Sequence, residues 1–203
     1  MRIGSTDTKN RIIETATELY SKFGLKSVSI DDIANNMGMS KKTIYQYFVD
    51  KNELINIATQ RYLALEKEAL KQFEDQAKNA VHFFIKSNNY FTRNVRDTSS
   101  VNIIELKRSH AQAWEIVEHF RNDVLKQAIS ANLQKGIEQE LFRSGLDIEI
   151  MSRLRIQEIS SLFDDNVFSK RSFDTAIVSN KILEYFIHGI STDVGLKLYK
   201  VYK

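Results

Sequence analysis

The sequence predicts an all-α protein. Its 203 residues contain no proline and only seven glycines, and helix interiors reject proline more strongly than any other residue. Apolar side chains recur at helical spacing along most of the chain, as at Ile12, Ala16 and Leu19. A hydrophobic fraction of 42% and a charged fraction of 27% are typical of a globular protein with a substantial core. We therefore expect about nine helices and no sheet.

The composition excludes several functional classes. Without cysteine the chain can form neither disulfides nor thiolate metal sites, which fits a reducing, cytoplasmic location. The N-terminus lacks the apolar segment of a signal peptide, and no apolar run approaches the length of about 18 residues that a membrane span needs. The net charge of +3 does not by itself indicate nucleic acid, and residues 1–51 carry eight Lys or Arg against six Asp or Glu. A nucleic-acid signal must therefore be local.

The first two helices have clear ends. The first is expected from Asp7 to Phe23, and Gly24 can take the left-handed conformation that ends a helix. Ser29 is expected to cap the second helix, because an acidic residue, Asp32, follows it three positions later as in a capping box.

The remaining helices follow from similar local signals. Gly38–Met39 breaks the second helix, and Ser40 can cap a third that runs through Tyr47. A fourth begins at Asp50 and keeps its apolar period to about Phe73. Further helices are expected at roughly 78–95, 99–110, 113–140, 147–168 and 172–191.

The two helices around Gly38–Met39 form a helix-turn-helix arrangement. The second helix of such a pair fits the major groove of DNA, where its N-terminal side chains reach base edges. Lys51 lies in the first turn of the next helix, where the helix dipole disfavours a cation, so a phosphate partner would explain its position. The groups on the second helix that suit bases or phosphates are Lys41, Lys42, Thr43, Tyr45, Gln46 and Tyr47.

Other interpretations of the same residues remain open. We expect Phe48 in the core, and Tyr47 could lie in the core or beside the groove. A pair of lysines is often plain surface, and helix-turn-helix corners occur in many helical proteins. The alternative function is therefore a helical protein-interaction module without sequence-specific DNA binding.

A series of motifs recurs in fixed order between Arg11 and Ile55: Leu19-Tyr20-x-x-Phe23-Gly24, Ser29, Ile33-Ala34, Gly38-Met39-Ser40, Thr43-Ile44-Tyr45, Tyr47-Phe48 and Lys51-x-Glu53-Leu54. In order and spacing this stretch resembles the N-terminal DNA-binding domain of the tetracycline-repressor (TetR) family. The resemblance implies a helix-turn-helix DNA-binding domain at residues 1–51 and a helical ligand-binding and dimerisation domain at residues 52–203.

The resemblance also implies a function. A member of the family would be a ligand-responsive transcriptional regulator, more often a repressor than an activator, that binds a roughly palindromic double-stranded DNA operator as a homodimer. An unknown small-molecule effector would release it, and no cofactor or membrane partner is expected. In or beside the groove the resemblance places Lys41, Lys42, Tyr45, Gln46 and Tyr47, and it places Ser29 and Lys51 on phosphates.

The last predicted helix, residues 172–191, carries an apolar stripe. The resemblance places this helix in the interface with a second subunit, and two-fold dimers gain affinity through paired half-sites. An internal core helix is the alternative. The candidate interface residues are Leu183, Phe186, Ile187 and Ile190.

The middle helices are rich in aromatic residues. Such stripes usually belong to a core, but an indole N–H and an imidazole can orient a mostly apolar ligand. The candidate ligand-binding residues are Phe84, Tyr90, His110 and Trp114. The sequence contains no His-Glu-x-x-His, no glycine-rich phosphate loop and no Gly-x-Ser-x-Gly motif. We therefore expect neither an enzyme nor a metal site.

Overall fold

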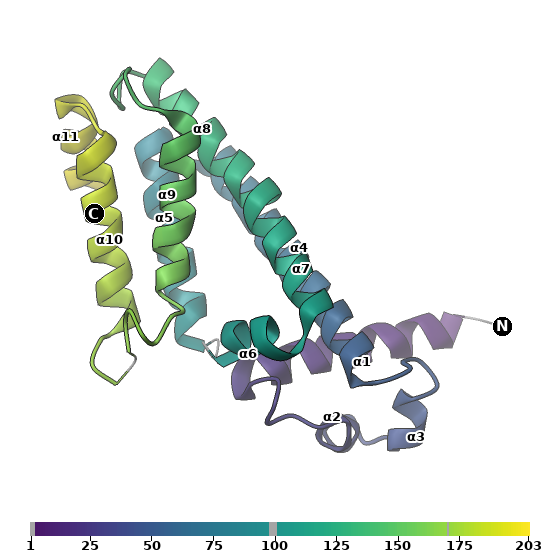
Figure 1. Cartoon of the computed structure of the whole chain (residues 1–203). Coiled ribbons are helices and arrows are strands. Elements are labelled where there is room, and N and C mark those ends of the chain that lie inside the picture. The colour runs from purple at the N-terminus through teal and green to yellow at the C-terminus, as the bar shows by residue number, and fades with distance from the viewer. Residues whose placement is uncertain (1–2, 98–100, 170) are drawn as a thin grey trace. The chain divides into compact units, whose positions relative to one another are not determined.

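The computed structural model describes residues 3–97, 101–169 and 171–203 (Figure 1). These residues form helices and turns and contain no strand beyond an isolated bridge between Phe142 and Ser191. The all-α prediction is therefore confirmed. The elements are α1 (Ile3–Phe23), α2 (Ile30–Asn36), α3 (Lys41–Ile44), α4 (Lys51–Gln76), α5 (Ala80–Asp97), α6 (Val101–Ser109), α7 (Ala111–His119), a π-helix (Phe120–Leu125), α8 (Lys126–Glu138), α9 (Ile148–Ser161), α10 (Thr175–Ile190) and α11 (Asp193–Tyr202).

The chain divides into two compact units. Unit 1 consists of Met1–Glu66 and Asp97–Glu118, and unit 2 consists of Lys67–Arg96 and His119–Lys203. Unit 1 extends beyond the DNA-binding domain predicted at residues 1–51, because side chains of α4 and of the α6–α7 corner belong to its core. The functional division at residue 51 stays a prediction.

Unit 1 has a core built from the inner faces of its helices. Ile12 of α1, Ile33 of α2 and Leu54 of α4 are fully buried in it. Phe48, predicted to be a core residue, is also fully buried. Helix α2 buries three side chains in this core and α3 buries one, so most other residues of these two short helices are left at the surface.

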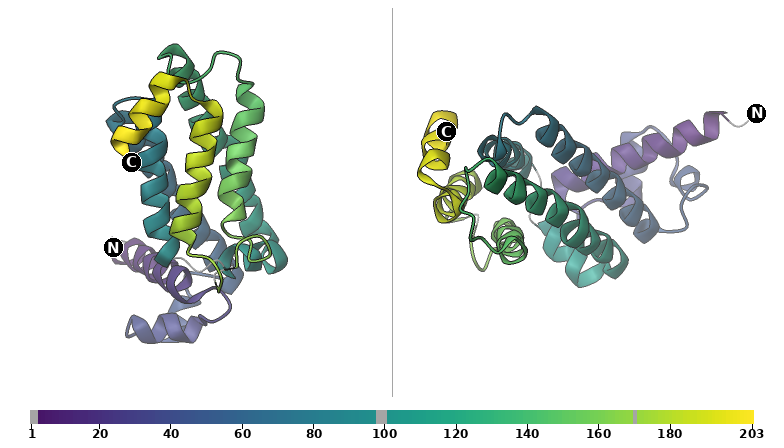
Figure 2. Two further views of the ribbon diagram at one scale, coloured as in Figure 1. Left: turned by 90° about the vertical axis from the view of Figure 1, so that its left-hand side faces the viewer. Right: turned by 90° about the horizontal axis from the view of Figure 1, so that it is seen from above.

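Unit 2 is a helical bundle formed by the second part of α4 with α5, α8, α9, α10 and α11. Helices α9 and α10 run side by side in two views of the ribbon (Figures 1 and 2). Position 136 of α8 requires glycine, because a Cβ there would collide with the ring of Phe142. Fully buried side chains in this core include Leu133, Phe142, Ile187 and Ile190.

Several predicted helix ends differ from the structure. Helix α3 stops at Ile44, and the residues to Tyr47 form turns in which Tyr47 N donates to Ile44 O at 2.9 Å. The helix predicted at 113–140 contains the π-helix, and α9 ends at Ser161 rather than near residue 168. The start predicted at residue 99 lies outside the described residues.

Helix α11 was not predicted. Thr192 caps it, and the Thr192 hydroxyl accepts a hydrogen bond from Gly195 N at 3.2 Å. Among the described residues, no helix combines the length and the apolar character that crossing a membrane requires.

Candidate nucleic-acid interface

The turn between α2 and α3 has the geometry that its sequence predicts. Gly38 lies at φ +65°, in the left-handed region that favours glycine. The next amide, Met39 N, donates to Ala34 O at 3.0 Å and so satisfies a carbonyl near the end of α2. Ser40 then caps α3, because its side chain accepts a hydrogen bond from Thr43 N at 3.1 Å. The predicted helix-turn-helix is confirmed.

The surface of α3 and its following turn carries the polar side chains that suit DNA. Lys42 and Gln46 are exposed, and Tyr45 is 46% exposed. Thr43 is half-buried, and its hydroxyl lies 2.9 Å from the Ser40 hydroxyl. Lys42, Tyr45 and Gln46 therefore form an exposed set on one short element.

Lys41 differs from its neighbour Lys42, because it is held by an ion pair. Its Nζ lies 2.8 Å from Asp31 Oδ2 on α2. The hydrogen bond and the charge of Asp31 raise the pKa of Lys41. The pair ties the first turn of α3 to α2, so a phosphate that approached Lys41 would compete with Asp31 for the ammonium group.

Tyr47 is half-buried and packs against the core of unit 1. Tyr47 was predicted to lie either in the core or beside the groove. Its ring contributes to the core, while part of the side chain stays accessible. A role beside the groove stays a prediction.

Ser29 caps α2, as predicted. The Ser29 hydroxyl accepts from Asp32 N at 3.1 Å and lies 2.6 Å from Asp32 Oδ2, to which Ser29 N also donates at 2.7 Å. These bonds from Ser29 lower the pKa of Asp32. The Ser29 hydroxyl therefore donates its proton to Asp32. A phosphate at the predicted position would have to compete with Asp32 for this hydrogen bond.

Lys51 is placed by a contact that sequence reasoning missed. Its Nζ donates to Leu25 O at 2.6 Å and lies 5.9 Å from the ring centroid of Tyr20. Partial burial lowers the pKa of Lys51, against the opposing influence of the charges of Glu105 and Asp32. An ammonium group has three N–H donors, so the bond to Leu25 leaves donors for a phosphate.

The α6–α7 corner is tied to the rest of unit 1 by polar contacts. Asn56 Nδ2 donates to Gln112 Oε1 at 2.8 Å, and Lys26 N donates to Glu105 Oε2 at 3.0 Å. The residues of each contact lie more than fifty positions apart in sequence. Local patterns carry no signal for such pairs, and the sequence could not have revealed them.

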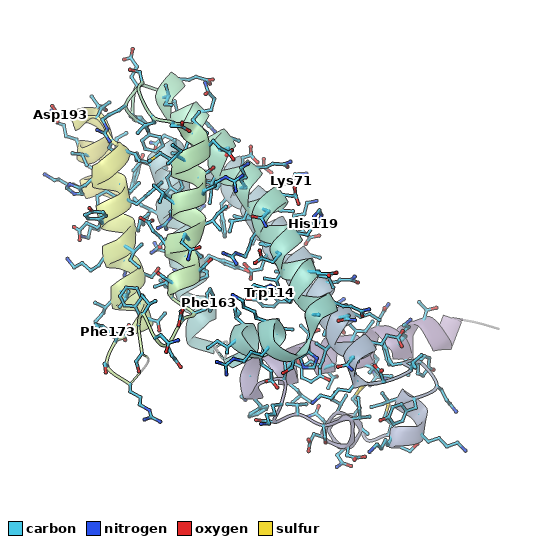
Figure 3. All side chains as sticks on the ribbon, in the orientation of Figure 1. Lys71, Trp114, His119, Phe163, Phe173 and Asp193 are labelled. Carbon is cyan, nitrogen blue, oxygen red and sulfur yellow. The ribbon has the colours of Figure 1, made fainter. Side chains whose placement is uncertain are left out.

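The four predicted ligand-binding residues are divided between the two units. In unit 2, Phe84 is a core residue and Tyr90 packs against Phe73, with ring centroids 5.1 Å apart. In unit 1, His110 Nδ1 lies 3.0 Å from Asn52 Oδ1. Trp114, which lies on α7 (Figure 3), is also in unit 1 and is covered by the ammonium group of Lys107 at 5.6 Å. Their role in ligand binding stays a prediction.

The predicted dimer-interface residues point into the single chain. Leu183, Phe186, Ile187 and Ile190 are all buried in the core of unit 2. Their period was interpreted correctly as one apolar face of a helix, but that face packs against the chain's own helices. These four residues therefore do not provide a surface that a second copy could contact, which corrects their assignment.

The described side chains include no group of three or more His, Asp or Glu residues that could hold a metal ion. The exposed polar set on α3 and its following turn is the candidate contact surface for DNA. A short capped helix that follows a glycine turn, on a small helical core, is the arrangement found in helix-turn-helix DNA-binding domains.

Comparisons with known proteins specify the family. Residues 12–57 match the family model "Bacterial regulatory proteins, tetR family". The fatty acid metabolism regulator protein of Bacillus subtilis (strain 168) is 23% identical over 193 residues, which cover 89% of this chain and 94% of that protein. The chain belongs to the tetR family and is a DNA-binding transcriptional regulator.

Solved structures share the fold over nearly the whole chain. A transcriptional regulator from Saccharomonospora viridis, solved in complex with choline, has a TM-score of 0.75 at 20% identity and covers 92% of this chain and 99% of its own. The regulator FadR from Bacillus subtilis, solved in complex with stearoyl-CoA, has a TM-score of 0.64 at 20% identity, covering 89% and 98%.

Proposed function

We propose that the protein is a ligand-responsive repressor, which binds a roughly palindromic DNA operator as a homodimer and is released by a small molecule. The observation that carries the DNA-binding part is the exposed set Lys42, Tyr45 and Gln46 on α3 and its following turn. The first offers an ammonium group to phosphates or to guanine, the second a phenolic hydroxyl and the third a forked amide for base edges. The set follows directly on the glycine turn that the motif requires.

The recognition element of one chain is short, so a single chain can contact only a few base pairs. Two-fold symmetric regulators solve this by placing two recognition elements on half-sites one helical turn apart, so a palindromic operator reflects the symmetry of the protein. We therefore propose that the functional form is a homodimer.

The proposed dimer surface consists of exposed apolar side chains of α9 and α10. Ile177 is 64% exposed and Tyr185 80% exposed on α10, and Ile150 and Leu154 are exposed one turn apart on α9. Large apolar side chains exposed on neighbouring helices are typical of a surface that another protein covers. A second copy of the chain is the partner that the proposed palindromic operator requires.

The small-molecule part of the proposal is supported by relatives of the same fold. The neighbours solved with choline and with stearoyl-CoA show that proteins of this fold accommodate chemically different ligands. Helix α4 belongs to both units, since it runs from Lys51 to Gln76 and the units meet in sequence after Glu66. We propose that ligand binding to unit 2 acts on unit 1 through this continuous helix.

The coupling needs a difference in affinity. A ligand that prefers the conformer unable to match both half-sites by about 1–3 kcal/mol lowers operator binding by roughly five- to 150-fold. A ligand that binds both conformers equally would release nothing, however tightly it bound.

Selection of bound sequences from random duplex DNA tests this function. The full-length protein is incubated with the pool, and the enriched sequences are compared. A consensus with two inverted half-sites is the expected result. If no sequence is enriched over several rounds, the helix-turn-helix surface is better explained as part of a protein-interaction module, and the proposed function is rejected.

A further inference from the structure

Unit 2 contains an arginine in its interior. Arg155 lies on α9, and its side chain is only 5% exposed. The guanidinium carbon lies 5.2 Å from the ring centroid of Phe186 on α10. Arginine stays protonated in proteins, so the interior of this unit holds a positive charge.

The hydrogen bonds of this buried cation are incomplete. A guanidinium presents five N–H donors. Within the described part of the chain, Arg155 makes only a bond from Nη1 to Glu158 Oε2 at 3.2 Å and a long contact from Nη2 to Asn88 Oδ1 at 3.4 Å. The Asn88 oxygen already accepts a shorter bond, at 2.9 Å, from the Ser179 hydroxyl. Among the described residues, Arg155 Nε has no hydrogen-bond acceptor.

Burial has a larger influence on the pKa values of Arg155 and Glu158 than the attraction between the two residues. Burial lowers the pKa of the Arg155 guanidinium, although the charge of Glu158 opposes that shift. Burial also raises the pKa of Glu158, although Arg155 opposes that shift in turn. Both shifts have the direction that burial of a charged group produces.

Polar groups from three helices surround Arg155, and two aromatic rings lie further along α5 and beyond the end of α9. Asn88 Nδ2 donates to Asn180 Oδ1 at 2.9 Å, so α5, α9 and α10 all contribute to the polar cluster around Arg155. One turn along α5 from Asn88, the ring of Phe91 meets that of Phe163 at a centroid distance of 5.4 Å, and Phe163 lies just beyond the end of α9 (Figure 3). Both rings are only half-buried.

We propose that Arg155 is the anion receptor of the effector site, and that the effector is an organic carboxylate with an apolar body. This inference rests on the proposed function, because it names the chemical class of the small molecule that releases the operator. The N–H groups at Nε and Nη2 are parallel and match the two oxygens of a carboxylate. The apolar body would lie against Phe91 and Phe163.

A monoanion suits this site better than a phosphate. Arg155 supplies one positive charge, and a dianion beside Glu158 would bring several uncompensated negative charges into the interior. Glu158 is 27% exposed. The Glu158 carboxylate can therefore turn towards solvent when the carboxylate of the ligand binds the Arg155 guanidinium.

The test compares carboxylates with their uncharged amides on the full-length, DNA-free protein. The probes are octanoate, decanoate and 4-phenylbutyrate, each with its amide, and calorimetry and thermal shift measure binding. We expect at least one carboxylate to bind at least about tenfold more tightly than its amide, since only the anion makes charge-assisted hydrogen bonds. No preference for any carboxylate, including no binding of any probe, would overturn the proposal.

Variants assign the preference to Arg155. The double variant Arg155→Met/Glu158→Gln removes the buried pair without leaving an unpaired carboxylate, and such replacements are often neutral or stabilising. It is expected to lose the carboxylate preference. Arg153→Met is the matched control, because Arg153 lies on the same helix but is exposed and paired with Glu149. A preference that survives in the double variant, or disappears equally in the control, contradicts the assignment.

The outcome can be separated from that of the proposed function. Operator selection without any probe reports DNA binding alone, whereas the carboxylate-to-amide ratio reports Arg155 alone. A protein that binds a palindrome but shows no carboxylate preference keeps the proposed function and loses this inference.

Discussion

The Nζ of Lys51 lies 2.6 Å from the carbonyl oxygen of Leu25. This bond joins the first turn of α4 to the connection between α1 and α2. It adds a partner for Lys51 that the sequence did not indicate, beside the phosphate that the sequence predicts. The same ammonium group can bond to Leu25 within unit 1 and also contact a DNA phosphate, because it has three N–H donors.

Lys51→Met separates these two roles. The methionine keeps an apolar stem but removes the ammonium group, so we expect the free energy of unfolding to fall by about 1 kcal/mol, the usual contribution of one hydrogen bond. Affinity for the selected operator is expected to fall as well. Urea unfolding and fluorescence anisotropy measure the two effects. An unchanged operator affinity in the folded variant would remove Lys51 from the DNA contacts.

Tyr45→Phe tests the exposed hydroxyl on the recognition element. Tyr45 is 46% exposed, and the change removes a single oxygen atom, so we expect unchanged thermal unfolding. Operator affinity should fall at least about tenfold, as expected for the loss of a hydrogen bond to a charged phosphate. If the variant binds the operator as tightly as the wild type, the Tyr45 hydroxyl does not contact DNA.

The proposed dimer surface can be distinguished from the core of the same helix by two nearby residues of α10. Tyr185 is 80% exposed, whereas Ile187 is fully buried. Tyr185→Glu is expected to give a folded monomer in analytical ultracentrifugation, because it places a charge in an apolar interface. Ile187→Ala is expected to leave the dimer intact but to lower the free energy of unfolding by about 2–4 kcal/mol.

A Tyr185→Glu variant that still sediments as a dimer would exclude this part of α10 from the interface. The comparison is made at equal protein concentration, since dimer stability depends on it.

The contact between α10 and the C-terminal residue gives a pH dependence. Lys203 and Lys181 lie 2.7 and 3.0 Å from the carboxylate oxygens of Glu184, and their hydrogen bonds lower its pKa from 4.5 to about 2. A lowered carboxyl pKa stabilises the fold above the unfolded value and loses this contribution as the pH falls towards the folded value. The contribution of Glu184 should therefore be present above about pH 4.5 and be lost towards pH 2.

Glu184→Gln checks this dependence by thermal unfolding across the acid range. The difference in melting temperature between the wild type and the variant should shrink as the pH falls from 6 to 2, and added salt should reduce it at neutral pH. A difference that stays constant over this pH range would show that the ion pairs of Glu184 do not contribute.

The parts of the structure that could be predicted from sequence depend on local chemistry. Ser29 with Asp32, Gly38 and the cap at Ser40 each act within three or four residues, and each was predicted in its observed role. The π-helix was missed, because the apolar pattern of 113–140 continues through it. The final helix, α11, was not predicted, although its cap at Thr192 is a local signal.

The missed parts of the site depend on contacts between distant residues. Periodicity shows that Leu183, Phe186 and Ile187 share a face, but it does not show whether that face meets the chain's own helices or a second copy. The bond from Lys51 to Leu25 likewise has no local signature. The burial of Arg155 is of the same kind, since an arginine in a helix is expected at the surface.

The salt dependence of operator binding, measured for the wild type and for Lys42→Ala, tests the central claim most directly. Lys42 is exposed on α3, and a lysine that contacts a phosphate contributes about one unit to the slope of log affinity against log salt concentration. A homodimer should therefore lose about two units of slope in the variant, with unchanged unfolding. A slope near zero for the wild type, or an identical slope for Lys42→Ala, would contradict the assignment of α3 as the DNA-reading element.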